Sequence, residues 1–502
     1  MSADLDQLSS TPPQTPVAGA KPRFGQRPVA PGELPLIMRK HILTATFGNA
    51  WGNLITGIIF IYFGNAIGMT QLQWGLLSGI GSWMVAAQPF GALFAERIGT
   101  RRLAWFWPAL GERILRMLTI IGAYLMWRAG HPGAYLLLMT GTCVAALSGN
   151  FANAPWFGWL ATIIPKDVQG AFWGRRDSWI SVVVIAVSLP SGFIMDLIPE
   201  SGKLEATVLI LIFASLLGFS DLLIHQTIPE PPFEPSRKKN LLEEILKPLR
   251  DTKFRPWLLF TASWNFGMSL GGSLCTLYFM ENLGFKNNLL GGMFALNVVG
   301  LVGTSLAARR MGRMVDRFGI RRMLSLGYSF WSLLPGIWLF ASPRSAVLVI
   351  GLASLVGGMF PVAANNAGVK LVTRFPAPQE AAIYMAVSTM VGSFCGGVGA
   401  IAAGTFLGII GTWSFTVLGL VVSGFPVLFM ISFALRLTST IVLIPRIRPK
   451  GTLPEQEQPF MLPMFFESLP GINRGMRGRI AGSGARRPNH PSEDRGPTPP
   501  RS

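Results

Sequence analysis

Residues 312–322 read GRMVDRFGIRR, and residues 92–102, which lie 220 positions earlier, read ALFAERIGTRR. Both stretches place a carboxylate directly before an arginine, then a glycine two positions later, and then a pair of arginines. A second correspondence, at a shift of 216, relates residues 61–63 (IYF) to residues 277–279 (LYF) and Asn49 to Asn265. Motifs that recur at almost the same spacing indicate an internal repeat, so the chain is expected to consist of two related halves.

The composition of the 502-residue chain is that of a membrane protein, because 50% of its residues are hydrophobic and only 13% are charged. Apolar stretches long enough to cross a hydrocarbon core of roughly 30 Å recur along the chain. The predicted spans cover residues 42–67, 73–96, 103–127, 134–163, 171–198, 206–228, 257–280, 288–308, 323–342, 345–373, 380–410 and 412–435. We therefore expect an all-α membrane protein with twelve transmembrane helices in two six-helix bundles related by a pseudo-two-fold axis.

These spans divide the chain into five segments. Residues 1–40, rich in Pro, Gly and Ala, are expected to form a disordered N-terminal arm, and residues 41–228 form the first bundle. Residues 229–256 are a linker whose apolar residues between 241 and 249 are typical of a short helix on the membrane surface. Residues 257–436 form the second bundle, and residues 437–502 are a basic, Pro-rich tail with an apolar patch at residues 460–466.

The formal net charge of +19 is distributed as a topology signal rather than as a nucleic-acid-binding surface. With the N-terminus inside, the inner loops hold 21 Lys and Arg residues and the outer loops hold four. Positive residues are retained on the cytoplasmic side, so both termini are predicted to be cytoplasmic, in the plasma (inner) membrane. The three cysteines fall inside predicted spans, and neither a disulfide, a metal site nor a cofactor is expected.

The repeated arginine-containing loop, which follows the second predicted span of each half, resembles the signature loop of the major facilitator superfamily. The resemblance covers residues 41–436, and its first copy departs from the pattern, with Ala92 in place of glycine and Glu96 in place of aspartate. It implies a monomeric secondary transporter that moves a small-molecule substrate across a lipid bilayer by alternating access. It implies no enzymatic activity.

The acidic and basic side chains of this loop are candidates for a conformational latch. A carboxylate at the inner end of a helix accepts hydrogen bonds from nearby arginines and from the positive N-terminus of a neighbouring helix. Such contacts hold two bundles together in one state and release them in another. The alternative is that the arginines only enforce topology. The candidate latch residues are Glu96, Arg97, Arg101, Gly312, Asp316, Arg317, Gly319 and Arg321.

The resemblance implies that the first, fourth, seventh and tenth spans line a central cavity, and each of these spans carries asparagine. An amide both donates and accepts hydrogen bonds, so a ring of amides suits the hydroxyl or amide groups of a substrate. The alternative is that these amides only join neighbouring helices. Tryptophans beside them either stack on a sugar ring or pack in the core. The substrate-binding candidates are Asn49, Asn53, Asn153, Asn265, Asn365 and Trp264.

Ionisable groups within the predicted spans are candidates for ion coupling. Glu112 and Arg116, four residues apart on the third span, share one helical face, where they form either a structural ion pair or part of a proton relay. Asp221 and His225 have the same spacing near the inner end of the sixth span, where we expect a solvated pair. The coupling candidates are therefore Glu112, Arg116 and Asp221, with protons as the coupling ion.

The apolar parts of the four cavity spans contain no carboxylate, which favours a neutral, hydroxyl-rich solute such as a sugar. Proton-coupled efflux of a drug or metabolite is an alternative. It is weakened because the fourth span lacks the arginine that drug antiporters of the superfamily place there. A further alternative is a transporter-like sensor or assembly factor that moves no solute, because a fold does not establish a function.

Overall fold

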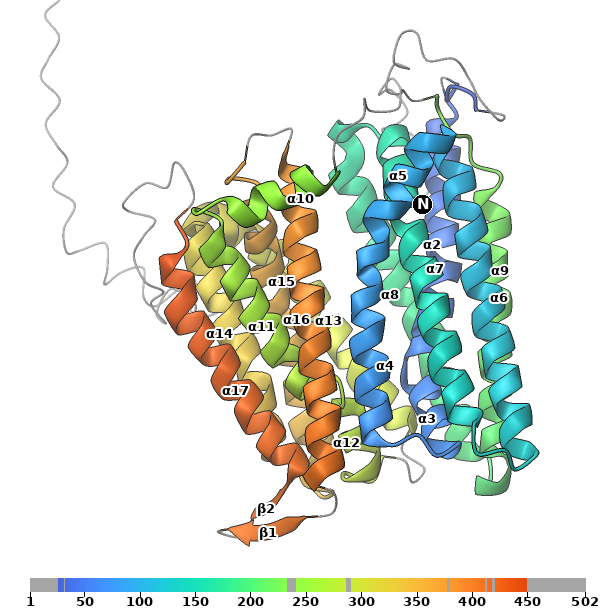
Figure 1. Cartoon of the computed structure of the whole chain (residues 1–502), viewed down its shortest axis with the longest axis vertical. Coiled ribbons are helices and arrows are strands. Elements are labelled where there is room, and N and C mark those ends of the chain that lie inside the picture. Colours follow the sequence, from blue (N-terminus) through green and yellow to red (C-terminus); the bar gives the residue numbers. More distant parts are fainter. Residues whose placement is uncertain are drawn as a thin grey trace, which may run out of the picture.

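The computed structural model describes residues 26–30, 32–232, 241–285, 290–376, 380–410, 413–417 and 420–448. Most of the expected N-terminal arm and C-terminal tail, including the apolar patch at residues 460–466, lies outside these residues. The described residues form two bundles of helices side by side, with the short helix α10 (Leu241–Arg250) at one end of the molecule and a β-hairpin at the other (Figure 1). We name these ends the α10 end and the hairpin end.

Six helical spans build the first bundle, and two of them are interrupted. The first span consists of α2 (Leu34–Thr56) and α3 (Ile58–Ala66), and the second of α4 (Gln71–Trp83), the 3-10 turn η2 (Met84–Ala87) and α5 (Gln88–Ile98). The other four are α6 (Arg101–Arg128), α7 (Ala134–Ile163), α8 (Lys166–Leu197) and α9 (Lys203–His225), with the turn η3 (Glu200–Gly202) before α9.

The second bundle repeats this order. Its first span consists of α11 (Arg255–Gly272) and α12 (Cys275–Glu281), followed by α13 (Leu290–Phe318), α14 (Ile320–Trp338), α15 (Ala346–Val372) and α16 (Ala381–Ile410). Strands β1 (Ser414–Val417) and β2 (Leu420–Ser423) pair antiparallel, with Ser414 opposite Ser423. They lead into α17 (Gly424–Leu443) and the turn η5 (Ile444–Arg446).

The first span of each bundle is broken at an equivalent position. The residues that directly follow α2 and α11 are Gly57 and Ser273, which lie 216 positions apart, the shift that relates the two halves of the sequence. Gly57 is needed at its break, because a Cβ there would lie 2.2 Å from the carbonyl oxygen of Asn53. Interrupted helices are typical of transporter spans that line a cavity, where protein or water satisfies the freed backbone groups.

Six of the described helices are long and apolar enough to cross a membrane by length and composition alone. They correspond to α7, α8, α9, α15, α16 and α17. The second span falls short because it is interrupted, and α6 falls short because it carries Glu112, Arg113 and Arg116 near its middle. Helices α13 and α14 carry arginines at the ends where they meet. Apart from the hairpin, the architecture is the helical membrane fold that the hydropathy pattern predicts.

The two bundles pack on each other through α4 against α16 and through α8 against α13. In the first contact, a Cβ at Gly75 would lie 2.7 Å from both the Ala400 carbonyl oxygen and Gly404 Cα. In the second contact, the backbone N–H of Gly291 donates to Asp196 over 2.8 Å. The glycines of the eleventh span thus allow close approach of helices from different bundles. The contacting segments of α4 and α16 lie toward the hairpin end (Figure 1).

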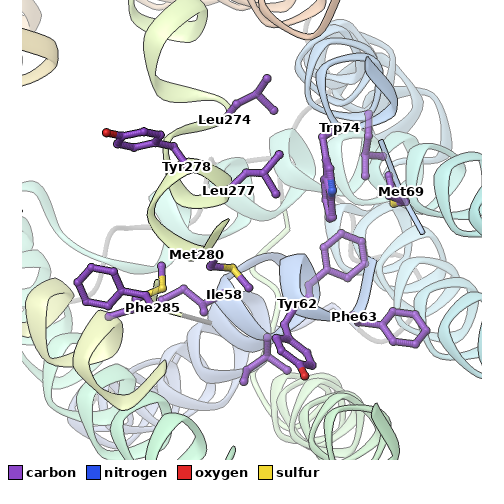
Figure 2. Packing of buried hydrophobic residues seen from close by; sticks show 14 of the residues in the cluster. Ile58, Tyr62, Phe63, Met69, Trp74, Leu274, Leu277, Tyr278, Met280 and Phe285 are labelled. Atoms are coloured by element: carbon purple, nitrogen blue, oxygen red, sulfur yellow. The ribbon is translucent and has the colours of Figure 1, made fainter. Parts of the chain in front are cut away.

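Apolar side chains from both bundles form one core (Figure 2). Its helices α3 and α12 lie toward the hairpin end (Figure 1). Ile58 and Phe63 of α3, Trp74 of α4, and Leu277 and Tyr278 of α12 belong to this cluster, and each is less than a tenth exposed. Helices α3 and α12 are the second parts of the two interrupted spans, and they contact each other across the bundles. This shared core holds the two bundles together in the arrangement seen here.

The structure corrects four of the predicted spans. The first and seventh, predicted as single runs over residues 42–67 and 257–280, are broken at Gly57 and Ser273, and the second and twelfth also differ. The twelfth span, predicted over residues 412–435, begins at Gly424 and continues to Leu443, because residues 414–423 contain the hairpin. The β-branched and aromatic residues of SFTV and LVVS favour strands as much as a membrane helix. The second span, predicted as one run over residues 73–96, is interrupted at η2. The short linker helix is present as α10, which packs against α11 and α16.

Candidate functional site

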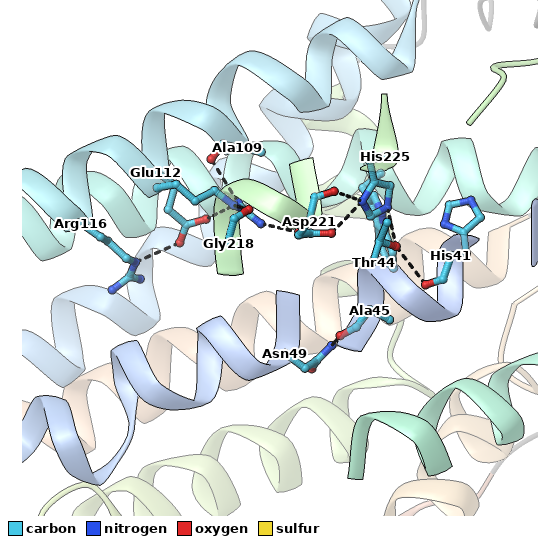
Figure 3. A network of polar contacts seen from close by, with 12 residues as sticks. His41, Thr44, Ala45, Asn49, Ala109, Glu112, Arg116, Gly218, Asp221 and His225 are labelled. Atoms are coloured by element: carbon cyan, nitrogen blue, oxygen red, sulfur yellow. Dashed lines mark hydrogen bonds and ion pairs between the residues drawn. The ribbon is translucent and has the colours of Figure 1, made fainter. Parts of the chain in front are cut away.

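A network of charged side chains lies inside the first bundle, between α6 and α9 (Figure 3). Arg113 donates to Asp221 over 3.0 Å and lies 3.5 Å from Glu112, and Glu112 also pairs with Arg116 over 3.2 Å. The four side chains are between 7% and 12% exposed. Each carboxylate therefore has a guanidinium partner, which offsets the cost of removing these charges from water.

His225 extends this network toward α2 and α7. Its Nδ1 lies 2.8 Å from Asp221 Oδ1, and its Nε2 lies 3.1 Å from Trp156 Nε1 and 3.4 Å from Thr44 Oγ1. The centroid of the His41 ring lies 5.4 Å from that of His225. His41 is only 2% exposed, and neither of its ring nitrogens has a hydrogen-bond partner among the residues that the structure describes. Two histidines and a carboxylate are thus enclosed at one level of the bundle.

Glycines on the neighbouring helices make room for the two carboxylates. A Cβ at Gly149 of α7 would lie 2.2 Å from Glu112 Oε2. A Cβ at Gly48 of α2 would lie 3.0 Å from Asp221 Oδ2. Larger residues at these positions would displace the Glu112 and Asp221 carboxylates, so the glycines are part of what positions the network.

The solvated pair predicted at Asp221 and His225 is wrong. The two residues are 5% and 3% exposed, because α2 and α6 both pack against α9. Glu112 and Arg116 form the ion pair that their spacing predicts. Arg113 was not among the candidates, although its place beside Glu112 in the middle of a span could have identified it. It is the residue that joins the two predicted pairs into one network.

The second bundle buries an arginine in a different setting. Arg436 of α17 is 2% exposed, and its guanidinium carbon lies 4.8 Å from the Trp264 ring centroid and 6.0 Å from that of Trp331. Among the residues that the structure describes, no carboxylate lies within ion-pair distance of Arg436. In the first bundle, Arg113 lies over Trp51 in the same way, at 4.3 Å. Arg436 was missed because the predicted twelfth span ends at residue 435.

A pocket of about 500 Å³ lies between the two bundles. Helices α2, α3 and α8 of the first bundle line it together with α12, α13, α14 and α15 of the second. Its lining contains no charged side chain. The polar side chains in the lining are Asn53, Ser188, Thr276, Asn297, Thr304 and Ser354. The pocket therefore offers neutral hydrogen-bond donors and acceptors from both bundles, set among apolar residues.

The asparagines that the sequence predicts to form a ring have different surroundings, and their binding of substrate stays a prediction. Asn53 lines the pocket, where its Oδ1 accepts a hydrogen bond over 2.6 Å from the serine of α8 that also lines it. Asn49 and Asn265 each donate over 2.8 Å to a carbonyl oxygen four residues earlier on their own helices. Asn153 and Asn365 are exposed. Of these five residues, only Asn53 lines the pocket between the bundles.

The two copies of the motif loop turn at equivalent glycines. Gly99 and Gly319, 220 residues apart, have φ of 76° and 88°, a backbone conformation that favours glycine. After the turn, Arg101 donates over 3.0 Å to a backbone carbonyl of α7, and Arg321 donates to a backbone carbonyl of η5. Each arginine therefore binds its own bundle in this state, and a latch between bundles stays a prediction.

The carboxylate that binds the first motif loop comes from the linker. Glu230, 3% exposed, accepts hydrogen bonds from the backbone N–H groups of Arg101 and Arg102, over 2.6 and 3.3 Å, at the N-terminus of α6. From the sequence we expected Glu96 to be the carboxylate that binds this loop. Glu230 was not predicted, because it lies in a proline-rich stretch outside the motif. Arg97 is exposed. The side-chain surroundings of Gly312, Asp316 and Arg317 on α13 lie outside the part of the chain that the structure describes.

Comparison with known proteins places this geometry in a family. The family model of the Major Facilitator Superfamily matches residues 42–311. A mutant form of the nucleoside transporter NupG is similar in structure, with a TM-score of 0.61 and 14% identity over 83% of this chain and 100% of that chain. The D-xylose–proton symporter has a TM-score of 0.59 and 13% identity, over 84% of this chain and 100% of its own.

A bacterial homologue of the iron transporter ferroportin in its inward-facing state has a TM-score of 0.60 and 14% identity, over 82% of this chain and 98% of its own. No match was found among curated proteins. Identities this low show the shared fold alone. The family model, however, covers more than half of the residues, so this chain belongs to the Major Facilitator Superfamily and is a secondary transporter of a small solute.

Proposed function

We propose that the protein carries a small, uncharged, hydroxyl-bearing solute such as a sugar, and that the solute binds in the pocket between the bundles. The observation that supports this most directly is the polar lining of the pocket, which consists of hydroxyl and amide groups from both bundles. Such groups exchange hydrogen bonds with water for hydrogen bonds with solute hydroxyls, and no unpaired charge is left buried. Among the solved neighbours, the D-xylose–proton symporter is named for a sugar.

The size and apolar walls of the pocket support the same solute class. A volume of about 500 Å³ lies within the usual range of small-molecule sites, roughly 300 to 1,000 Å³. Phe279, Phe294 and Trp338 are among its lining residues. Aromatic faces pack against the C–H faces of a sugar or against a base, while the polar groups fix its orientation.

The position of the pocket supports alternating access. It lies where the bundles meet, and the bundles contact each other through α4 with α16 and α8 with α13. Separation of these helix pairs would open the pocket toward the hairpin end. Basic residues are concentrated in the loops predicted at the α10 end, so we propose that this end faces the cytoplasm of a plasma (inner) membrane.

The charged network of the first bundle supports proton coupling. Glu112, Arg116 and Asp221 are ionisable groups enclosed in the spans, and such groups mark ion pathways in transporters. We therefore propose that a proton accompanies the solute or is exchanged for it. Proton-coupled efflux of a drug or metabolite is the second candidate, because it would use the same buried charges.

The test is solute flux in vesicles that contain the purified full-length chain. A panel of labelled monosaccharides and nucleosides is offered with and without a proton gradient. Asn53→Ala and Asn297→Ala should raise the KM for the transported solute about 3- to 10-fold, because each removes one pocket hydrogen bond worth about 1 kcal/mol. Asn153→Ala is the matched control, because Asn153 is exposed and does not line the pocket.

Two results would overturn the proposal. One is the absence of flux for every uncharged solute in the panel, together with flux of charged ones. The other is a KM that is unchanged in both pocket variants and raised in the control. Ligand binding without any flux would instead support the sensor alternative.

A further inference from the structure

The hydrogen bond between Trp156 and His225 defines the protonation state of His225 in this structure. An indole N–H only donates, so His225 Nε2, 3.1 Å from Trp156 Nε1, is the acceptor. On the other side of the ring, Nδ1 lies 2.8 Å from Asp221 Oδ1. A carboxylate only accepts, so Nδ1 carries the hydrogen. His225 is therefore the neutral imidazole with its hydrogen on Nδ1.

A proton on Nε2 is incompatible with this contact, because two N–H donors would then face each other. The other neighbour of Nε2 is Thr44 Oγ1, at 3.4 Å. The hydroxyl of Thr44 donates to the carbonyl oxygen of His41 over 3.0 Å, which leaves its lone pairs free to accept. A protonated Nε2 therefore has a new acceptor in Thr44, but only if Trp156 moves away.

Charged groups surround His225 on several helices. The guanidinium of Arg176 also pairs with Asp177 on its own helix over 3.2 Å. The helix α7 contributes only tryptophans, which do not titrate. The titratable and charged groups that face the site are His41 from α2, Glu112, Arg113 and Arg116 from α6, Arg176 from α8 and Asp221 from α9.

We propose that His225 is the proton-binding residue of the transport cycle, and that protonation of its Nε2 releases Trp156. The inference rests on the proposed proton-coupled transport and supplies the site of its proton. The proton enters at Nε2, the bond that breaks is the hydrogen bond from the indole, and the positive charge formed is balanced by Asp221 through Nδ1. No ion pair of Arg113 has to break.

Release of Trp156 would change how three helices of the first bundle hold together. Helix α7 packs mainly on α5 and α6, and α9 packs on α2 and α6, so the bond from Trp156 to His225 is a bridge between α7 and α9. Arg176 of α8 lies on the Trp156 ring, with its guanidinium carbon 5.6 Å from the centroid. A positive His225 therefore frees the fourth span from the sixth and disturbs its contact with the fifth.

The proton site can be tested without knowing the solute. The full chain is labelled with 5-fluorotryptophan, and the resonance of Trp156 is assigned from a Trp156→Phe variant. Between pH 8 and pH 5 this resonance should move in one titration step. His225→Gln keeps an acceptor for the indole but cannot take a proton, so the step should vanish. Trp74 is the matched control, because its indole donates to the Asn65 amide oxygen over 2.7 Å, a group that does not titrate.

A second arm uses the solute flux measured in vesicles. Trp156→Phe removes the donor that only a neutral Nε2 can accept, so the midpoint of the pH profile should rise. Asp221→Asn removes the charge that favours protonated His225, so the midpoint should fall. A Trp156 resonance that does not titrate, or that still titrates in His225→Gln, would overturn the proposal. A titrating Trp156 without any flux would leave the proton site standing and defeat the transport proposal instead.

Discussion

Replacing Arg113 by methionine should destabilise the protein strongly, because Arg113 is the cation that joins two buried carboxylates. Its guanidinium donates to Asp221 over 3.0 Å and lies 3.5 Å from Glu112, in side chains 7% to 12% exposed. Methionine fills a similar volume, so the loss is mainly electrostatic. Glu112 keeps Arg116, but Asp221 keeps only the neutral His225. Removing one partner of a buried ion pair costs about 3–5 kcal/mol, and the free energy of unfolding should fall by about this amount.

The measurement is equilibrium unfolding of the full-length chain in mixed micelles, followed by circular dichroism. The double variant Arg113→Met with Asp221→Leu leaves neither charge unpaired and should recover at least half of the loss. Arg128→Met is the control on the same helix, because Arg128 is exposed near its end and should change stability by less than about 0.5 kcal/mol. A single variant as stable as the parent, or a double variant no more stable than the single one, would refute the electrostatic account.

Three further changes test other contacts. Glu230→Gln should raise amide hydrogen exchange at the start of α6 and cost about 1 kcal/mol, because it weakens the cap on two backbone N–H groups; unaltered exchange there would contradict the capping role. Gly75→Val should lower the free energy of unfolding by about 1–3 kcal/mol, because a Cβ at Gly75 would lie 2.7 Å from a backbone carbonyl of α16. An unchanged stability would show that α4 yields at this contact. Arg436→Met should leave the free energy of unfolding within about 1 kcal/mol of the parent, since the cation–π contact roughly balances the cost of burying the charge; a loss above about 3 kcal/mol would reveal an anionic partner.

The fold could be predicted because its determinants are repeated along the chain. Apolar stretches report directly on membrane spans, and the shift that pairs Asn49 with Asn265 also pairs the helix breaks at Gly57 and Ser273. The breaks themselves were not predicted, because hydropathy does not change where a helix turns. The hairpin was also missed, since the residues before Gly424 are as apolar as a span. Both errors concern backbone direction, on which apolar composition carries little information.

The candidate site was harder to predict, because burial of a polar side chain depends on the helices that pack over it. Asp221 lies near the end of α9, where a carboxylate is ordinarily solvated, yet α2 and α6 cover it. Asn49 and Asn265 occupy corresponding positions in the two halves, as a shared ring requires. Each amide, however, donates to a carbonyl oxygen of its own helix. Glu230 was missed because its partners lie about 130 residues away in sequence. Such contacts follow from tertiary packing and have no local signal.

The two bundles bury arginines in different chemical surroundings, and this difference assigns the response to pH. Arg113 of the first bundle pairs with Asp221, whereas Arg436 of the second lies beside the rings of Trp264 and Trp331. His225 lets the first contact change its charge with one proton, whereas neither arginine nor tryptophan titrates near neutral pH. Protonation of His225 should therefore loosen α7 from α9 and leave the packing of α15 and α17 unchanged. Hydrogen exchange at pH 5.5 and 7.5 should differ in the first pair of helices and agree in the second; equal changes in both bundles would show that the proton acts elsewhere.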